Sequence, residues 1–544
     1  MQRLASLWTV RIVALIALVV SLSHCASERD KSVTPTIVTQ SEWKEAPAPY
    51  AAPALARLGY RMQSEPSNRE QYGEIEENPF IAVSASPRST FSIDVDRASY
   101  SNVRRFLTEG TAPPRDAVRI EELVNYFPYD YAEPGGDLPV ALAAEVGEAP
   151  WRRQHRLVRV GLQARRIELA QAPPANFVFL LDVSGSMQPA NKLPLLQRAF
   201  GLLVEQLRPQ DRVAIVVYAG AAGLVLPSTP GTEKAEILEA IQGLDAGGST
   251  AGGAGIRLAY VEAAAHFVPG GNNRVILATD GDFNVGASSD AEMVQLIERK
   301  RASGVFLTVL GFGEGNLQDA KMEKLAQHGN GNYAYIDNLL EARKVLVHEM
   351  GGTLVAIAKD VKVQVEFNPV RVRAYRLIGY ENRLLRDEDF ADDTKDAGDI
   401  GSGHSVTALY EVIPVGVESD ALVREPAPLR YQQPGSAARV ASDELLTVQV
   451  RYKRPDDDHS QLLSLPVVDS GDRTVSLDFQ FQAAVAEFGL LLRRSPYKGA
   501  SDYGHVVEAA RASLGEDRQG YRAEFVQLVE RARGIDLAQT SDKD

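Results

Sequence analysis

The chain has 544 residues, which suggests about three to four domains at roughly 150 residues each, and its composition is ordinary for a globular protein. Its 58 basic and 72 acidic residues give a net charge of −14, which argues against a nucleic-acid binder and against electrostatic adhesion to an anionic membrane. The single cysteine excludes an intramolecular disulfide, a cysteine-ligated zinc ribbon and an iron–sulfur cluster, and the eight histidines form no HExxH motif.

The first 25 residues have the form of a secretory signal. Two arginines and no acid precede residues 12–20, an unbroken apolar run that is too short to span a membrane, which takes about 20 residues. The tetrapeptide LSHC ends at Cys25 and resembles a bacterial lipobox, in which the cysteine thiol is acylated, although His24 stands where that pattern has a small residue. We therefore predict a lipoprotein signal peptide over residues 1–25. The alternatives are cleavage by another peptidase and an uncleaved anchor.

Residues 26–80 are predicted to be a disordered tether, because they are rich in Pro, Ser, Glu and Ala and show no apolar period. About 50 flexible residues have an r.m.s. reach of about 40 Å, which would lift the folded part away from a bilayer. By resemblance to bacterial lipoproteins, Ala26 after the cysteine suggests sorting to the outer membrane. The expected location is therefore the bacterial cell envelope, with a lipid anchor and a periplasmic or surface-facing orientation.

Residues 81–170 are predicted to form an α+β region that flanks the next domain. Asp96 is expected to cap its first helix and Gly110 to end it. Apolar and polar residues alternate over residues 157–163, which predicts a strand with one face in water. The predicted helices are 98–109 and 116–126, and the predicted strands are 90–94, 140–146 and 157–163.

Residues 171–351 change to continuously apolar strands that alternate with helices. This pattern predicts an α/β fold with a doubly wound, mostly parallel sheet that is covered on both faces. Such sheets bind ligands at the carboxyl ends of their strands. The predicted strands are 177–181, 213–218, 275–279, 305–310 and 333–336, and the predicted helices are 193–207, 234–244, 252–267, 291–302, 317–328 and 339–350.

Three short motifs in this region can converge at the carboxyl edge of the sheet. A D-x-S-x-S motif with Asp182, Ser184 and Ser186 follows the first strand, GGST ending at Thr250 precedes a helix, and TDG with Asp280 follows another strand. Together they offer two carboxylates and three hydroxyls, a hard oxygen set of the kind that Mg²⁺ prefers. Taken singly, each hydroxyl could instead be a helix N-cap, and each aspartate could cap a loop.

The motifs DVSGSM, GGST and TDG resemble the metal-ion-dependent adhesion site (MIDAS) of the von Willebrand factor A (VWA) family in type, order and approximate spacing. The resemblance implies that Ser184, Ser186 and Thr250 ligate a Mg²⁺ ion, or Mn²⁺ or Ca²⁺, directly or through water. It implies that Asp182 and Asp280 act mostly through water, and that an acidic side chain of a partner protein fills the open coordination position.

Two further groups of acidic and amide residues are weaker candidates for metal binding. Asp245, Asp282 and Asn284 could surround the metal site or contact a partner, or they could simply solvate their loops. The acidic segment 386–399 could bind Ca²⁺, but its spacing misses the EF-hand pattern, which favours a solvated loop.

Residues 352–480 are predicted to be strand-rich and residues 481–544 helical. Stretches in both flanks, among them STFSIDVDRASYSNVRRFL and GYRAEFVQLVE, resemble the bacterial YfbK-like lipoproteins. Each flank alone offers few strands, and strands need partners to bury an apolar face. We therefore expect the VWA domain to be inserted into one strand-rich domain built from both flanks, rather than to separate two independent domains.

The favoured function is that of a lipid-anchored binding protein without catalytic activity, because no nucleophile–base pair is visible beside the metal motifs. The chain lacks the GK[ST] of a P-loop and an intact GxSxG, which argues against a nucleotide site and against a serine hydrolase of that type. One alternative is a scaffold or adaptor with a structural metal. A second is a metal-assisted hydrolase, for which Asp282 is the visible candidate base.

Overall fold

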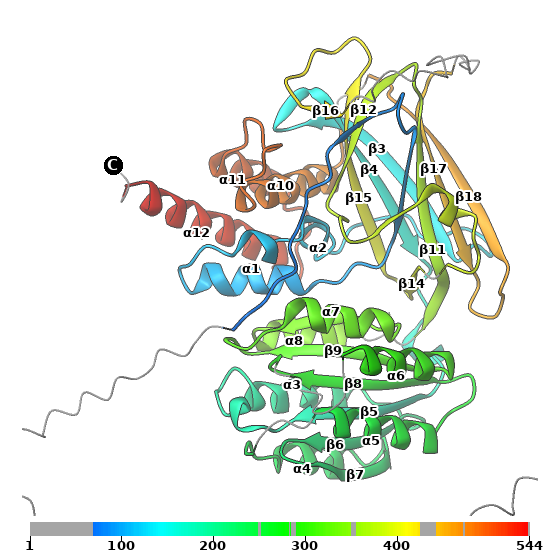
Figure 1. Ribbon diagram of the computed structural model, residues 1–544, viewed down its shortest axis with the longest axis vertical. Coiled ribbons are helices and arrows are strands. Elements are labelled where there is room, and N and C mark those ends of the chain that lie inside the picture. The colour runs from blue at the N-terminus through cyan, green and yellow to red at the C-terminus, as the bar shows by residue number, and fades with distance from the viewer. Residues whose placement is uncertain are drawn as a thin grey trace, which may run out of the picture. The chain divides into compact units, whose positions relative to one another are not determined.

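The computed structural model describes residues 69–248, 252–281, 283, 290–349, 355–395, 397–424, 442–471 and 474–541. The predicted signal peptide with Cys25, the tether up to residue 68, Thr250, Asp282 and Asn284 lie outside these ranges. Within them the strands form three sheets of six strands each (Figure 1).

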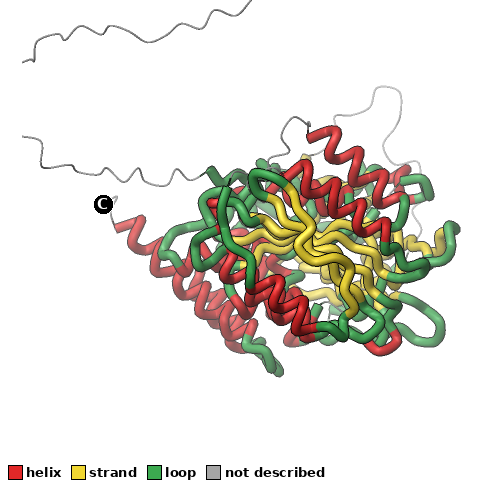
Figure 2. The backbone as a smooth tube through the Cα atoms, turned by 90° about the horizontal axis from the view of Figure 1, so that it is seen from below, coloured by secondary structure: helices red, strands yellow, loops and turns green. Residues whose placement is uncertain are grey.

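The central region forms the predicted α/β sheet, in the order β10-β9-β8-β5-β6-β7. Its strands are continuously apolar because both faces are covered: all eight residues of β5 are buried. Helices lie on both sides of the strands in the view from below (Figure 2). The five parallel strands are β5 (Ala175–Asp182), β6 (Arg212–Tyr218), β8 (Asn272–Thr279), β9 (Val305–Phe312) and β10 (Tyr333–Ile336), and β7 (Ala222–Pro230) is an antiparallel edge strand that the sequence did not predict.

Successive residues of β5 point to opposite faces of this sheet, so two hydrophobic clusters form. Phe177 and Phe179 pack under one set of helices, and Val178 and Leu180 pack under the other. The first set is α3 (Leu193–Glu205), α4 (Lys234–Gln242), α8 (Leu339–Arg343) and the π-helix η4 (Lys344–His348), and the second is α5 (Gly252–Ala265), α6 (Asp290–Ala302) and α7 (Asp319–His328). Of the predicted helix 339–350, Leu339–Arg343 is α-helical and Lys344–His348 is π-helical.

Strands from both sides of this domain pair with one another. β4 forms a long antiparallel ladder with β15, and β2 pairs with β11, so the α/β domain is inserted into a strand-rich domain built from both flanks. Two sheets of that domain share one apolar core, as in a sandwich. One sheet contains β16 (Val423–Arg424), β1 (Phe80–Ala82), β12 (Val372–Ile378), β15 (Ser405–Pro414), β4 (Arg152–Ala164) and β3 (Val140–Ala149), and the other contains β13 (Leu384–Leu385), β2 (Arg88–Ser92), β11 (Ala356–Phe367), β17 (Glu444–Lys453), β18 (Ser460–Val468) and β14 (Gly398–Gly401).

A helical layer covers the outer face of the first sheet, which corrects the prediction that one face of residues 157–163 lies in water. On that face Arg159 and Gln163 are buried, and the Tyr131 ring lies so close to Gly161 that an added Cβ would be 2.4 Å from it. The layer contains α1 (Ala98–Thr108), α2 (Ile120–Val124), α10 (Leu477–Leu492), α11 (Tyr503–Ala512) and α12 (Tyr521–Ser541). None of the helices in the described ranges is long and apolar enough to cross a membrane.

Two local predictions about the first helices are wrong. Asp96 does not cap α1: its carboxylate accepts a 2.7 Å hydrogen bond from the Tyr333 amide and a 3.2 Å bond from Arg383, because β10 lies beside it. The second helix is interrupted, since a short 3₁₀ turn (Arg115–Ala117) precedes α2. Gly110 does follow the end of α1, with a positive φ of 78° that suits glycine.

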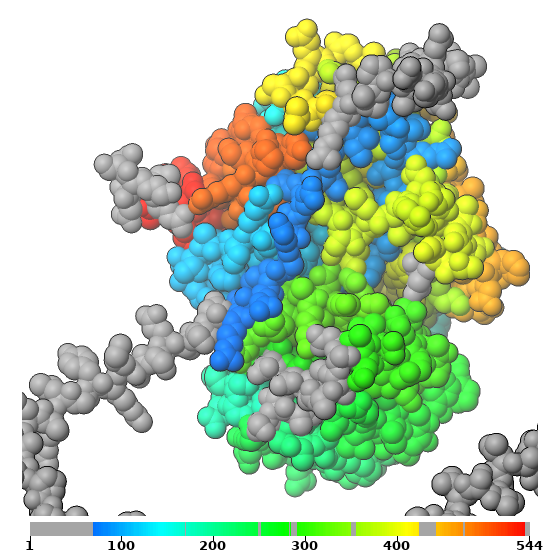
Figure 3. All heavy atoms as spheres, in the orientation of Figure 1, coloured from blue at the N-terminus to red at the C-terminus, as the bar shows by residue number. Residues whose placement is uncertain are grey.

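Residues 69–80, which the sequence assigned to the tether, are packed against the folded chain. Gln71 forms a parallel bridge with Gln318, and Glu70 accepts hydrogen bonds from the Gly315 amide and from Arg105. These contacts join the segment to the loop between β9 and α7, and Figure 3 shows the segment in blue on the surface. Its polar composition therefore reflects a surface strap rather than a free linker.

Candidate metal site

The three sequence motifs meet at the carboxyl edge of the α/β sheet. Asp182 ends β5, Thr279 ends β8, and Asp280 follows it directly. The loop that carries the glycine pair is joined to the first motif, because the Gly185 amide donates to the Gly248 carbonyl at 3.0 Å and the Gly247 amide donates to the Val183 carbonyl at 2.8 Å. Gly248 has a φ of 84°, a conformation that favours glycine at the turn.

Asp182 ties three strand ends together. One carboxylate oxygen accepts a 2.9 Å hydrogen bond from the Ser184 amide, and the other accepts bonds from the Tyr218 and Thr279 hydroxyls at 3.2 and 3.1 Å. Burial raises the pKa of Asp182 to about 6, against the effect of the Ser184 hydrogen bonds, and the nearby Asp280 raises it further. Asp182 thus orients the first motif while both of its oxygens accept hydrogen bonds.

Asp280 is held by a lysine that the sequence analysis did not single out. The Lys192 ammonium lies 2.8 Å from one carboxylate oxygen, and the Asn316 amide donates to the same oxygen at 3.3 Å. Burial opposes ionisation, but the charge of Lys192 and the hydrogen bonds from Lys192, Ser186 and Asn316 together outweigh it and lower the pKa of Asp280. Lys192 is itself buried at the start of α3, with 6% of its side chain exposed. The two aspartates of the candidate site, Asp182 and Asp280, therefore lie in opposite electrostatic environments.

The two serine hydroxyls lie side by side. Their Oγ atoms are 3.1 Å apart, and Ser186 also hydrogen-bonds to Asp280. Ser184 stands at the N-cap position of the 3₁₀ turn Gly185–Met187, yet its hydroxyl makes no capping bond there. The alternative in which this hydroxyl serves as a helix cap therefore fails. Ser184, Ser186, Asp182 and Asp280 present an oxygen-only donor set, which fits a Mg²⁺-type ion.

Neither Asp245 nor the described residues of the acidic segment 386–399 form a cluster of carboxylates that could hold a second metal ion. Asp245 is exposed on the loop before Gly247. In the acidic segment, Asp389 pairs with Arg386, and Asp393 lies 3.4 Å from Arg451, which is the behaviour of a solvated loop tied down by cations. Among the described residues, no group of three or more His, Cys, Asp or Glu side chains could hold a metal ion, so the hydroxyl-rich edge is the candidate site.

A second polar cluster, in the strand-rich domain, has no sequence signature. His155 of β4 is fully buried; its Nδ1 lies 2.6 Å from Glu411 and its Nε2 lies 2.8 Å from the Ser419 hydroxyl. Arg376 also donates to Glu411, at 3.1 Å, and the pKa of Glu411 is lowered despite its burial because His155 and Arg376 stabilise its charge. This cluster fastens the segment around Ser419 to the sheet.

Comparison with known proteins agrees with this architecture. Residues 176–347 match the von Willebrand factor type A domain, residues 66–159 match a family described as von Willebrand factor, and residues 352–535 match the C-terminal region of YfbK. Protein YfbK of Escherichia coli (strain K12), described as uncharacterized, is 44% identical over 499 residues, which cover 90% of this chain and 86% of that protein. The chain belongs to the YfbK-like family of VWA-domain proteins.

More distant similarities fall mainly on parts of the chain. Protein sll0103 of Synechocystis is 30% identical over 211 residues, which cover 38% of this chain and 48% of that protein. The solved structure titled von Willebrand factor type A from Catenulispora acidiphila is 17% identical, covers 69% of this chain and 87% of that chain, and has a TM-score of 0.39. VWA domains are in general protein-interaction modules rather than enzymes, and this chain contains one.

Proposed function

We propose that this protein is an envelope-anchored binding protein whose VWA domain holds a partner protein through a divalent ion. The grouping of Ser184, Ser186 and Asp280 at the carboxyl edge of the sheet carries the proposal. Hydroxyl and carboxylate oxygens are the ligands that Mg²⁺ prefers, and the resemblance to the MIDAS adds Thr250. When bound, the ion would supply an open coordination position for an oxygen of the partner.

The protein's own residues would prepare this site in two ways. Asp182 fixes the Ser184 backbone through the 2.9 Å hydrogen bond, and Asn316 and Lys192 fix Asp280. An acidic side chain of the partner is the expected ligand, because a divalent cation beside exposed loops attracts a carboxylate. Mg²⁺ is proposed as the ion, with Mn²⁺ or Ca²⁺ as substitutes.

Anchoring is the second part of the proposal. Acylation of Cys25 would attach the chain to the cell envelope. The protein would then bind its partner while anchored to the outer membrane. Cys25→Ser should move the protein from the detergent phase to the aqueous phase in phase partitioning without changing its thermal stability. If the variant still partitions with detergent, an uncleaved apolar segment at residues 12–20 is the anchor instead.

The decisive experiment on the binding function combines calorimetry with partner capture. Purified full chain should bind Mg²⁺ or Mn²⁺, and Ser186→Ala should weaken that binding at least tenfold, whereas Ser303→Ala, a matched serine on the turn after α6, should not change it. A partner captured from envelope extract in Mg²⁺ should be released by EDTA and should not be captured by Ser186→Ala.

The two rival functions give different results in the same experiment. A scaffold with a structural metal would bind the ion but keep its partner in EDTA. A metal-assisted hydrolase would show turnover of an envelope substrate that Asp282→Asn abolishes. An unchanged Mg²⁺ affinity in Ser186→Ala would refute the metal assignment itself.

A further inference from the structure

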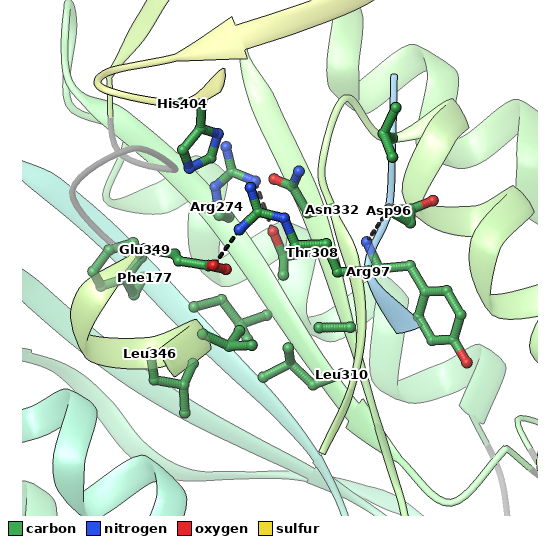
Figure 4. Close-up of a pocket in the computed structure, with 15 residues that line it drawn as sticks. Asp96, Arg97, Phe177, Arg274, Thr308, Leu310, Asn332, Leu346, Glu349 and His404 are labelled. Atoms are coloured by element: carbon green, nitrogen blue, oxygen red, sulfur yellow. Dashed lines mark hydrogen bonds and ion pairs between the residues drawn. The ribbon is translucent and has the colours of Figure 1, made fainter. Parts of the chain in front are cut away.

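One polar cluster in the strand-rich domain ends in a hydroxyl rather than in an ion pair. Figure 4 shows the contrasting arrangement, in a cavity walled by the VWA domain and its flanks: the Arg97 guanidinium pairs with the Glu349 carboxylate, and the His404 ring lies close to both. The other cluster joins a carboxylate, an imidazole and a hydroxyl one after another. Its members are Glu411, His155 and Ser419.

Neighbouring strands bring the imidazole and the carboxylate together. Glu411 of β15 lies opposite Leu157 of β4, and His155 lies two residues before Leu157, so the side chains of His155 and Glu411 point to the same face of the sheet. Arg376 of β12 lies directly opposite Glu411 on that face. The loop between β15 and β16 then places the Ser419 hydroxyl 2.8 Å from His155 Nε2.

The hydrogen bonds of the cluster run in one direction. Burial opposes the ionisation of Glu411, yet its pKa is lowered, chiefly by the hydrogen bond from His155 and the charge of Arg376. An ionised carboxylate can only accept, so Nδ1 of the neutral His155 ring, 2.6 Å from Glu411, carries the proton and Nε2 accepts. The Ser419 hydroxyl therefore donates to Nε2, while its oxygen accepts a 3.1 Å hydrogen bond from the Ala421 amide.

This arrangement is the one that activates a serine for attack on an acyl group. The hydroxyl donates to an imidazole whose other nitrogen is held by a carboxylate, and both contacts are within hydrogen-bond distance. Triads of this kind occur on unrelated folds and in several chain orders, so they are recognised by geometry and not by a sequence motif. The lack of an intact GxSxG in the chain therefore does not exclude one.

The surroundings of Ser419 indicate which acyl groups would reach it. The residue is partly exposed, on the loop between β15 and β16. Val415 and Leu422 in the same loop are 53% and 81% exposed, and their apolar surface favours contact with an aliphatic group. Glu418, which precedes Ser419 and is exposed, disfavours an anionic substrate. A neutral ester of a short aliphatic acid meets these conditions.

We propose that Ser419, His155 and Glu411 form a triad that hydrolyses neutral esters of short aliphatic acids. This activity goes beyond the proposed binding function and does not involve the candidate metal site. Ser419 is the nucleophile, and His155 is the general base. Glu411 is a positioning residue: it orients the imidazole and stabilises the imidazolium that forms, without taking a proton itself.

The reaction takes two steps. In the first, the Ser419 oxygen bonds to the acyl carbon and its proton passes to His155 Nε2. The bond from the acyl carbon to the ester oxygen breaks, and His155 returns the proton to the departing alcohol. In the second, a water oxygen bonds to the same carbon and one water proton passes to His155. The bond to Ser419 then breaks, the free acid leaves, and His155 returns the proton to the serine oxygen.

The test uses the purified full chain in EDTA, so that its failure and a failure of the metal-dependent binding function are distinguishable. A fluorophosphonate probe should label Ser419, identified by mass spectrometry of the labelled peptide, and the chain should hydrolyse p-nitrophenyl butyrate. Ser419→Ala should abolish this labelling and lower ester turnover at least tenfold. Ser303→Ala is the matched control and should change neither, because Ser303 is exposed and donates to the Lys300 carbonyl.

Two further variants separate catalysis from a purely structural role of the cluster, in samples shown to be folded by circular dichroism. His155→Gln should lower the rate of labelling at least tenfold, because the hydroxyl loses its base. Glu411→Gln should lower kcat for the ester at least tenfold while KM stays within about twofold, because Glu411 does not touch the substrate.

A thiol variant keeps the test decisive if the buried positions do not tolerate change. Ser419→Cys in a Cys25→Ser chain places the single thiol beside His155, which should lower the pKa of that thiol. It should react with iodoacetamide at about pH 6 at least tenfold faster than Ser303→Cys in the same chain. The proposal is overturned if the probe leaves Ser419 unlabelled, if His155→Gln is labelled at the wild-type rate, or if the two thiols react equally fast.

Discussion

The candidate metal edge, where Ser184, Ser186 and Asp280 lie, and the joint between the VWA domain and its flanks use polar side chains in contrasting ways. At the metal edge, neighbouring hydroxyls such as those of Ser184 and Ser186 lie side by side, and loops present them. At the joint, Arg104, Arg119 and Arg383 are buried, and each touches at least two carboxylates, some of them on the VWA domain and some on the flanks.

The contrast teaches what each region can tolerate. A hydroxyl pair on loops over a rigid sheet can exchange water, metal and partner oxygens with little effect on the fold. A buried arginine among carboxylates cannot be removed at so little cost, because its loss leaves uncompensated charge in a low-dielectric interior. The joint therefore fixes the VWA domain to the rest of the chain, while the hydroxyl pair at the candidate metal edge does not hold the two domains together.

The strongest test of this contrast is Arg119→Met. Arg119 lies 2.7 Å from Asp319 of α7 and also pairs with Glu122 of the flank, and all three side chains are buried. Removing the cation should lower the free energy of unfolding by about 3–5 kcal/mol, measured by chemical denaturation. Mg²⁺ affinity, measured where the variant is folded, should stay within about twofold.

Arg386→Met is the control for this variant, because Arg386 pairs with Glu388 and Asp389 but 66% of its side chain is exposed. Exposed pairs contribute little, so the control should leave the free energy of unfolding almost unchanged. If Arg119→Met and Arg386→Met lowered the free energy of unfolding equally, the buried ion pairs of the joint would contribute no more to stability than an exposed pair does.

The same contrast explains how much of the site could be predicted from the sequence. Asp182, Ser184, Ser186 and Asp280 stand in short motifs at strand ends, so local pattern alone places them together. Lys192 and Asn316 reach Asp280 only through the fold. The one signal for Lys192 was a lone lysine before an apolar helix, and Asn316 had none.

The fold shows the same limit. Continuous apolar strands alternating with helices predict the VWA sheet, and the shared ladder of β4 and β15 confirms the insertion. The edge strands β7 and β18 were missed because each contains proline, which edge strands tolerate and which weakens the strand pattern. The joint pairs residues about 200 positions apart, as in Arg119 with Asp319, and no local pattern encodes such pairs.

The second prediction concerns an uncharged group at the joint. Because burial lowers the pKa of His404 to about 4, the unfolded chain binds a proton below about pH 6.5 that the folded chain does not bind. The contribution of His404 should therefore lower the free energy of unfolding as the pH falls from about 6.5 to 4, by at most about 3 kcal/mol. Above about pH 6.5 its contribution should not change with pH. Denaturation of wild type and His404→Gln at several pH values isolates this contribution. A stability difference between them that does not change with pH would contradict it.

The third prediction tests whether the Lys192 ammonium competes with Mg²⁺ for the Asp280 carboxylate. Lys192 neutralises Asp280, so Lys192→Met should lower stability in EDTA, by about 1–3 kcal/mol, because the buried carboxylate loses its cation while Asn316 still donates to it. Mg²⁺ should then restore more stability to the variant than to the wild type, which appears as a larger shift in unfolding temperature. Lys234→Met is the control, since the Lys234 ammonium donates to the Glu205 carbonyl in a solvent-exposed contact. Equal Mg²⁺-dependent shifts in all three proteins would mean that Lys192 has no influence on the ion.

The smallest expected effect lies where the surface strap meets the loop that carries Asn316. Glu70 accepts a 2.9 Å hydrogen bond from the Gly315 amide and pairs with Arg105 at 2.8 Å. Glu70→Gln keeps the shape and the amide contact but removes the charge from a buried pair. It should lower the free energy of unfolding by less than Arg119→Met does, because Arg105 keeps Glu109 and Glu314 within 3.8 Å. Because Asn316 follows Gly315 directly and holds Asp280, Glu70→Ala should in addition weaken Mg²⁺ binding by about two- to threefold. If Glu70→Ala lowers stability yet leaves Mg²⁺ affinity unchanged, the strap belongs to the joint alone, and the metal edge is independent of it.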